Sequence, residues 1–230
     1  MERKKEHHNG SILSPILANI YMHYVLALWF EKKVKPNFKG ECYITVYADD
    51  CVCCFQYKGE AEVFAKEALP NRLAKFGLQL AEDKTRLIKF GRFTEGNCKI
   101  GKPETFDFLG FTHYCSKSRD GRFRVKRKTA RKKFKSKIKE FKIWLKENIR
   151  LKVKDLIFRI NIKLRGHYQY FGITDNYESL NKFLYEIDKM LFKYLNRRSQ
   201  RNSYTFETYR AMKKTYPLLT PKIYVNIYDI

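Results

Sequence analysis

The chain has 230 residues, enough for one large domain or two small ones with a buried core. Lys and Arg total 48 against 24 acidic residues, so the formal net charge is +24, and aromatic residues make up 16% of the chain. A charge this large repels itself in a compact protein, which favours a polyanionic partner. Because aromatic rings can stack on bases, the composition favours nucleic acid over a membrane surface.

The sequence lacks the segments that would direct a protein to a membrane. No apolar stretch reaches the ~18 residues of a membrane span, and residues 1–8 are charged, unlike a signal peptide. We therefore expect a cytoplasmic protein. The cysteines lack the paired C-x-x-C spacing of a zinc site, which predicts reduced, partly buried thiols. They are Cys42, Cys51, Cys53, Cys54, Cys98 and Cys115.

The first part of the chain has a helical pattern followed by a β-prone one. Apolar residues recur at helical spacing over residues 14–34, and Ser14 followed by Pro15 suits a helix start with Ser14 as N-cap. Two β-prone runs then occupy residues 43–47 and 51–55. We expect a long helix and then a hairpin.

Two adjacent carboxylates, Asp49 and Asp50, fall between the two expected strands. Like charges at a hairpin tip repel each other, and a divalent cation would offset that repulsion. Hard cations such as Mg²⁺ take carboxylate, water and phosphate oxygens, and two ions about 3.5–4 Å apart clamp the reacting oxygens in polymerase chemistry. The alternative is a solvated turn, where Asp is common.

After the hairpin, helical and strand patterns alternate. A helix is expected over residues 60–76, with Gly77 as its stop. Residues 106–111 alternate as in a strand, and a turn signal at residues 119–122 leads into a basic strand at residues 123–127.

From Thr129 onward the pattern becomes helical. The expected helices cover residues 129–148, 153–171, 177–198 and 205–215, with an extended tail at residues 222–228. The change in pattern predicts a domain boundary between residues 114 and 129, so the fold class is α+β.

Positive charge is concentrated near that boundary. Residues 117–154 contain 18 Lys or Arg against three acids. Phe134, Ile138, Phe141 and Leu145 form an apolar stripe, so the helix can pack on one side and present cations on the other. A nucleic-acid surface and a merely solvated helix face both remain open.

Four motifs carry a family resemblance. They are residues 10–19 (GSILSPILAN), 47–50 (YADD), 77–80 (GLQL) with Lys84-Thr85, and 108–111 (FLGF). Residues 165–172 (RGHYQYFG) and 195–199 (LNRRS) extend it into the second half. With these motifs in this order, the chain resembles the group II intron reverse transcriptases, also called intron-encoded maturases.

The resemblance implies a fold and an organisation. A partial polymerase palm, an antiparallel sheet with packed helices, is expected over residues 10–120 after a leader of residues 1–9. An all-helical thumb or maturase domain is expected over residues 121–230. Proteins of this family copy RNA into DNA and help their intron RNA to fold and splice.

The resemblance also implies catalytic residues. Asp49 and Asp50 match the family's metal-binding carboxylates, with Mg²⁺ as the cofactor. Successive strand residues point to opposite faces, so one carboxylate would face the ions directly, and we expect it to be Asp49. Lys84 matches a lysine near the incoming nucleotide, where it would neutralise the leaving pyrophosphate; a plain surface lysine is the alternative.

Further residues are implied in nucleic-acid binding. Template and nucleotide contacts fall on Ser14, Pro15, Asn19, Tyr47 and Ala48, although Asn19 would equally cap local backbone. Primer contacts fall on Leu109 and Gly110, and a strand bulge would also use Gly110. RNA contacts are expected from Arg127, Lys128, Arg131, Lys132, Lys135, Lys139, Arg165, His167, Arg197 and Arg198, with His167 packing first and touching RNA second.

The chain departs from the family pattern at its front. Members carry a fingers region and a palm strand with a further catalytic aspartate before the Ser-Pro motif, and nine residues precede Gly10 here. We therefore expect an N-terminally truncated enzyme that is impaired or inactive alone. A degenerate gene copy, an alternative start and a split gene with a separately encoded N-terminal half all stay open.

Two functions follow from the sequence. The first is an RNA-directed DNA polymerase whose partners are intron RNA, an RNA template with a DNA primer, and deoxynucleoside triphosphates. The second is a splicing cofactor that binds RNA without polymerase activity.

Overall fold

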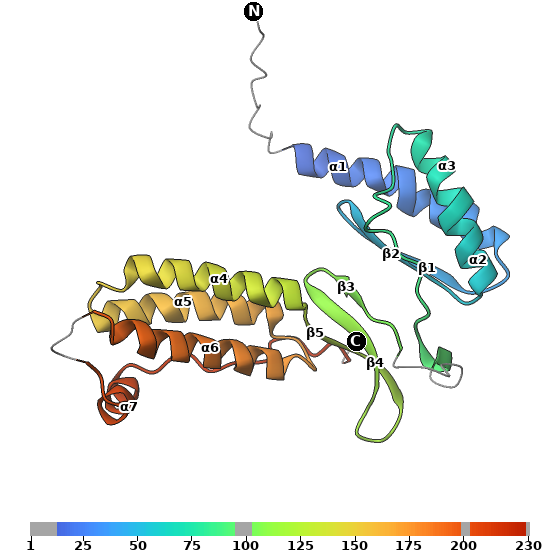
Figure 1. Cartoon of the computed structure of the whole chain (residues 1–230). Coiled ribbons are helices and arrows are strands. Elements are labelled where there is room, and N and C mark those ends of the chain that lie inside the picture. Colours follow the sequence, from blue (N-terminus) through green and yellow to red (C-terminus); the bar gives the residue numbers. More distant parts are fainter. Residues whose placement is uncertain (1–12, 95–102, 199–202, 229–230) are drawn as a thin grey trace, which may run out of the picture. The chain divides into compact units, whose positions relative to one another are not determined.

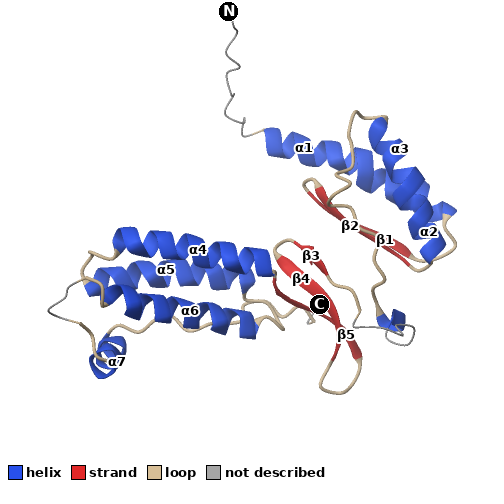
Figure 2. Ribbon diagram, viewed as in Figure 1, coloured by secondary structure: helices blue, strands red, loops and turns tan. Residues whose placement is uncertain are grey.

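The computed structural model describes residues 13–94, 103–198 and 203–228. The chain divides into two compact units, Met1–Lys89 and Phe90–Ile230. Each unit combines helices with a small antiparallel sheet, as Figures 1 and 2 show. The expectation of a mixed helix and sheet fold is thus confirmed. Cys98 lies outside the described residues.

The first unit begins with the expected long helical segment. Helix α1 (Ser14–Met22) continues through wide π-helical turns at His23–Ala27 and Phe30–Val34 and ends in a 3₁₀ turn. Ser14 is the first helical residue rather than the N-cap. The reason is that Leu13 already has helical φ and ψ, and its carbonyl accepts the first helical hydrogen bond, from Leu17 (2.9 Å).

The expected hairpin is present as strands β1 (Cys42–Tyr47) and β2 (Asp50–Phe55). One face of this hairpin packs against the helices through side chains of both strands, including Ile44 and Cys53. Cys54 lies on the other face and is exposed, so the expectation of partly buried thiols is wrong for this residue. Among the described cysteines, Cys42 is buried and Cys51, Cys53 and Cys115 are partly buried.

The second expected helix is interrupted. It consists of α2 (Lys58–Val63), a π-helical turn at Phe64–Ala68, and α3 (Leu69–Ala74). The interruption ends at Ala68, two residues before Pro70, which has no N–H to donate. Gly77 has a φ of 67°, and the next N–H, that of Leu78, bonds to the carbonyl of Leu73 (3.0 Å), which confirms the expected helix stop.

The second unit contains a three-stranded sheet. Its strands, in the order β3-β4-β5, are β3 (Phe106–Phe108), β4 (Phe111–Lys117) and β5 (Phe123–Thr129). The expectation of one strand over residues 106–111 is wrong, because Leu109 and Gly110 turn the chain back with φ values of 49° and 79°.

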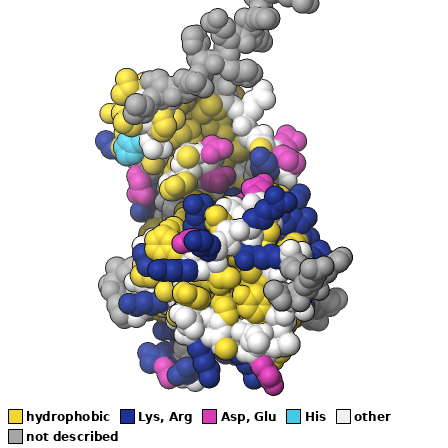
Figure 3. Space-filling view, turned by 90° about the vertical axis from the view of Figure 1, so that its left-hand side faces the viewer, with side chains coloured by type: hydrophobic (Ala, Val, Ile, Leu, Met, Phe, Trp, Pro, Cys, Tyr) yellow, Lys and Arg dark blue, Asp and Glu magenta, His cyan; other side chains and the backbone are white. Residues whose placement is uncertain are grey.

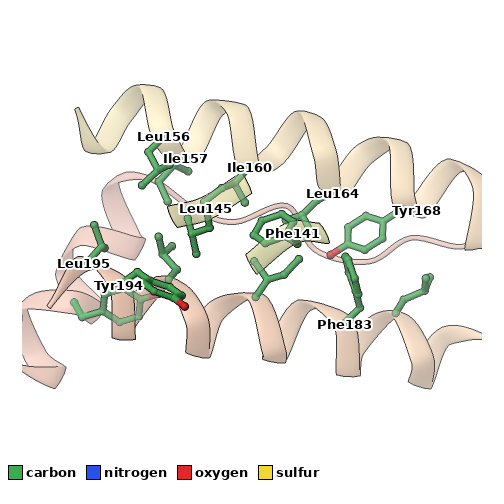
Figure 4. Packing of buried hydrophobic residues seen from close by; sticks show 14 of the residues in the cluster. Phe141, Leu145, Leu156, Ile157, Ile160, Leu164, Tyr168, Phe183, Tyr194 and Leu195 are labelled. Atoms are coloured by element: carbon green, nitrogen blue, oxygen red, sulfur yellow. The ribbon is translucent and has the colours of Figure 1, made fainter. Parts of the chain in front are cut away.

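Three long helices form the main core of this unit. They are α4 (Arg131–Asn148), α5 (Val153–Phe171) and α6 (Tyr177–Leu195), close to the expected limits. Figure 4 shows their apolar side chains meeting between the helices, with Leu145, Leu164 and Tyr168 fully buried. The apolar faces of the three helices therefore point to this core, and their charged residues lie on the outer faces.

The end of the chain runs back along the helices. Helix α7 (Phe206–Thr215) begins after Thr205, whose side chain accepts from the N–H of Thr208 (3.2 Å). The described part of the tail after α7, residues 216–228, is irregular, and Val225 forms a bridge with Ile173. No helix in the described part of the chain is long and apolar enough to cross a membrane.

The boundary between the compact units falls after Lys89. The division into a palm to residue 120 and a thumb from residue 121 concerns function and stays a prediction. Strands β3 to β5 belong by their packing to the same unit as helices α4 to α6.

Candidate catalytic hairpin and nucleic-acid surface

The two candidate metal-binding carboxylates lie at the tip of the β1–β2 hairpin. Tyr47 pairs with Asp50, so Ala48 and Asp49 form a two-residue turn. Ala48 has a φ of 53°, a left-handed conformation that costs a residue with a side chain about 1 kcal/mol. This turn places two carboxylates side by side in sequence at one end of the sheet.

Asp50 shares a face of the sheet with Tyr47. Directly opposed residues on neighbouring strands lie on the same face, and the next pair, Val46 with Cys51, packs against the helices on the opposite face. Tyr47 is 62% exposed. An open face with an aromatic ring beside a carboxylate is therefore available to a ligand.

The side chains of Asp49 and Asp50 suit a hard divalent cation. Both are exposed, and within residues 13–94, 103–198 and 203–228 neither accepts a side-chain hydrogen bond or forms an ion pair. Water and phosphate oxygens would complete the coordination shell. The described residues contain no group of three or more His, Cys, Asp or Glu that could hold a metal. The two carboxylates are therefore the candidate ligands at the hairpin tip.

The other residues expected near the nucleotide lie elsewhere in the first unit. Ser14, Pro15 and Asn19 are exposed on α1. Lys84 is exposed in a turn where its N–H bonds to the carbonyl of Ala81 (3.0 Å). Among the described residues no hydrogen bond or ion pair joins Ser14, Pro15, Asn19 or Lys84 to the hairpin tip, and their roles stay predictions.

The expected primer-binding residues form the turn between β3 and β4. The carbonyl of Gly110 accepts from the N–H of Ala130 (2.9 Å), and the carbonyl of Leu109 accepts from the hydroxyl of Tyr170 (3.0 Å). A Cβ at Gly110 would lie 3.6 Å from Phe171, an ordinary contact, so the glycine is needed for its φ rather than for space. The start of α4 and the end of α5 therefore hold this turn.

One face of α4 carries a row of lysines. Lys132, Lys135 and Lys139 are exposed and lie opposite Phe134 and Phe141, which pack into the core. In the described part of the chain these three lysines form no ion pair. Figure 3 shows many Lys and Arg side chains on the surface turned toward the viewer. Such unpaired cations suit phosphate contacts.

The remaining expected RNA-binding cations differ in their exposure and in the contacts that they already make within the chain. Arg165 is exposed. Arg198, just after α6, donates to the carbonyl of Leu151 in the α4–α5 connection (2.7 Å), so it also has a structural role. The ammonium of Lys128 lies 5.2 Å from the ring centre of Tyr114. The other cations in this set are Arg127, which is partly buried, and Arg131 and Arg197, which are exposed.

His167 is mainly a packing residue. Its ring stacks on Phe183 with the ring centres 3.7 Å apart. Burial, with repulsion from Lys137, lowers the pKa of His167 to about 4, so the imidazole is neutral near pH 7. Its Nε2 has no hydrogen-bond partner among the described residues. A neutral imidazole offers RNA no charge, and an RNA contact by this residue stays a prediction.

Two residues hold the second unit together through hydrogen bonds that the sequence did not predict. The motif around Tyr170 predicts a residue that packs first and contacts RNA second, and does not predict its bond to the Leu109 carbonyl. Asn176 is fully buried; its Oδ1 accepts from the N–H of Thr129 (2.7 Å) and its Nδ2 donates to the carbonyl of Phe171 (2.8 Å). An Asn before a helix suggests a cap, but this side chain bonds to other segments.

Comparison with known proteins identifies two family domains. Residues 3–113, which include the carboxylate hairpin, match the model of the reverse transcriptases (RNA-dependent DNA polymerases). Residues 131–216, which include the lysine row, match the maturase-specific domain of group II introns. The chain belongs to the group II intron reverse transcriptases and maturases. No curated protein gives a significant match.

These two domains imply nucleic-acid partners, namely intron RNA and a template with its primer. Reverse transcriptases generally use Mg²⁺, which agrees with the oxygen donors at the hairpin tip. The nucleic-acid partners and the use of Mg²⁺ are properties of the matched families as a whole.

Proposed function

We propose that the chain serves RNA-directed DNA synthesis through the β1–β2 hairpin and binds group II intron RNA through its basic helical unit. The observation that carries this proposal is the pair Asp49 and Asp50, presented on a strained two-residue turn inside the segment that matches reverse transcriptases. In this proposal residues 10–120 act as a palm and residues 121–230 as a thumb or maturase domain.

Asp49 and Asp50 would hold Mg²⁺, which stabilises charge on the attacking and leaving oxygens when bound. Lys84 would lie near the leaving pyrophosphate and offset its charge. Leu109 and Gly110 would contact the primer strand through the backbone of the turn that the positive φ of Gly110 allows. The nucleotide and template would lie beside Ser14, Pro15, Asn19, Tyr47 and Ala48.

The 230-residue chain alone is expected to be a weak polymerase. Two-metal phosphoryl transfer needs ions fixed against the primer hydroxyl, and among the described residues no third carboxylate joins the hairpin pair. A separately supplied fingers polypeptide of a group II intron reverse transcriptase, which carries a further carboxylate, would complete the coordination shell. Synthesis is therefore expected to depend on that polypeptide.

Primer extension with Mg²⁺ tests the catalytic assignment. Little DNA is expected from the 230-residue chain alone, and more when the fingers polypeptide is present. Asp49→Asn keeps the shape of the side chain and should abolish the synthesis. The matched control is Asp120→Asn, since Asp120 is an exposed aspartate in the β4–β5 turn. Robust synthesis by the chain alone would contradict the claim that its metal coordination shell needs a further carboxylate. Synthesis unaffected by Asp49→Asn would contradict the catalytic role of Asp49.

A second candidate function is an RNA-binding splicing cofactor without polymerase activity. It is favoured by the position of the lysine row, which lies in the maturase-matched segment rather than in the hairpin. Splicing of the cognate intron that survives Asp49→Asn but fails when Lys132, Lys135 and Lys139 are changed to Gln would support the cofactor. If the three lysine changes leave the splicing rate unaltered, α4 does not bind the intron RNA.

A further inference from the structure

Cys51 and Cys53 lie two residues apart on strand β2 and on the same face of the hairpin. Their paired residues, Val46 and Ile44, pack with them against the helices of the first unit. Neither thiol is fully enclosed, since both cysteines are only partly buried. Interaction with the Cys51 thiol, together with burial, raises the pKa of the Cys53 thiol. The strand thus brings two accessible thiols together directly after Asp50.

The register of the hairpin places no other two cysteines as well for a bond. Cys42 lies opposite Phe55 and is fully buried, and as the diagonal neighbour of Cys53 its Cα is about 7–8 Å away. Cys54 follows Cys53 in sequence, but it points to the opposite face of the sheet, where it lies opposite Tyr43. The two cysteines separated by one residue are therefore the candidate pair.

A disulfide between Cys51 and Cys53 would strain the strand. Alternate Cα atoms of an extended strand lie about 6.6–6.8 Å apart, at the upper end of the range of about 4.4–6.8 Å that disulfides span. The bond would therefore draw the two residues together and shorten the start of β2. Asp50, which pairs with Tyr47 at the hairpin tip, directly precedes this segment. The pairing at the tip is therefore the part of the hairpin that the bond would loosen.

We propose that Cys51 and Cys53 form a redox-sensitive modification site, which low-molecular-weight disulfides such as glutathione disulfide oxidise to a Cys51–Cys53 disulfide. The bond would loosen the tip that carries Asp49 and Asp50, and reduction would restore it. Strained disulfides are easily reduced, so the modification would be reversible. The site goes beyond the proposed function, because the bond forms whether or not the hairpin is catalytic.

Thiol–disulfide exchange forms the bond in two steps. The sulfur of one cysteine attacks a sulfur of glutathione disulfide, which breaks the S–S bond and releases one glutathione thiol. The sulfur of the second cysteine then attacks the first cysteine sulfur and releases the second glutathione thiol. The two cysteines lose two electrons to glutathione disulfide, and their two S–H protons pass to the two released thiols.

Peptide mass analysis of the 230-residue chain tests the proposal. The chain is incubated with glutathione disulfide, the remaining thiols are blocked, and the protein is digested with trypsin. The tryptic peptide of residues 40–58 contains Cys42, Cys51, Cys53 and Cys54 and no other cysteine. This peptide should lose two hydrogens, and dithiothreitol should restore them. Fragmentation of the oxidised wild-type peptide should not separate residue 51 from residue 53, a result that needs no substitution.

Two double variants are matched controls for each other. Cys42→Ala with Cys54→Ser leaves only the proposed pair in the peptide, which should still lose two hydrogens. Cys51→Ser with Cys53→Ser leaves the other two cysteines, and the peptide should keep its hydrogens. In the oxidised wild-type chain, the amides of residues 46–51 should exchange about tenfold faster than in the reduced chain.

Three results would overturn the proposal. They are a lasting glutathione adduct without an internal bond, a bond that forms equally in the variant lacking Cys51 and Cys53, and hydrogen exchange at the tip that oxidation leaves unchanged. None of these measurements depends on DNA synthesis, so their failure would leave the proposed function standing.

Discussion

His167 links the packing of the second unit to pH. Its ring lies against Phe183 and Phe171, and burial lowers its pKa to about 4. An unfolded chain holds the same imidazole at the ordinary value of 6.5 and so takes up a proton at a higher pH. The neutral imidazole therefore favours folding fully above pH 6.5, and this contribution is lost as pH falls toward 4.

The pH dependence of unfolding tests this account of His167. From about pH 7 to about pH 5 the wild-type chain should lose roughly 2 kcal/mol more unfolding free energy than His167→Phe, which keeps an aromatic ring but cannot titrate. Denaturant titrations at the two pH values give the difference. Equal losses in the two proteins would show that the imidazole is not buried in the neutral form. His113, whose pKa burial also lowers, is present in both proteins and so cancels.

At the scale of elements, the β3–β4 turn is where the sequence was least informative. Phe108-Leu109-Gly110-Phe111 continues an alternating apolar pattern, which predicts one strand. The chain instead reverses there, with a leucine in a left-handed conformation that leucine does not favour by itself. Ala130 and Tyr170, distant in sequence, supply the hydrogen bonds that hold this turn. A local pattern cannot reveal such partners.

Helices α4, α5 and α6 were predictable because their pattern is local. Their apolar residues recur every three or four positions over 18 or 19 residues, and this repeat alone defines a buried face. The hairpin was also predictable, because two β-prone runs flank the carboxylate pair. The π-helical turns of the first unit were not, since such turns are rare and the apolar spacing of a helix does not mark them.

The Tyr170 hydroxyl should stiffen the β3–β4 turn. Tyr170→Phe keeps the ring on Phe111 and removes the bond to Leu109, so the free energy of unfolding should fall by about 0.5–1 kcal/mol. Hydrogen exchange of the turn amides should become faster. Tyr185→Phe is the control, because Tyr185 is 63% exposed and its hydroxyl has no recorded partner among the described residues. Equal exchange in both variants would mean that the hydroxyl does not hold the turn.

At the scale of the whole molecule, the carboxylate pair and the main concentration of positive charge lie in different parts of the sequence. The carboxylate pair falls in the reverse transcriptase match, while the lysine row of α4 falls in the maturase match. Residues 117–154 carry 18 of the 48 cations. Because phosphate contacts release counterions, this concentration of charge should dominate the salt dependence of RNA binding.

The salt dependence of intron RNA affinity tests the central claim most directly, namely that α4 is the RNA-binding face. Each lost phosphate contact reduces the slope of log affinity against log salt by about 0.7–0.9. Changing Lys132, Lys135 and Lys139 to Gln should therefore reduce the slope by roughly two to three. The matched control changes three exposed lysines of the first unit, which are Lys32, Lys33 and Lys66. The account predicts a smaller slope for the α4 variant and little change for the control, and equal slopes in the α4 variant and the wild type would contradict it.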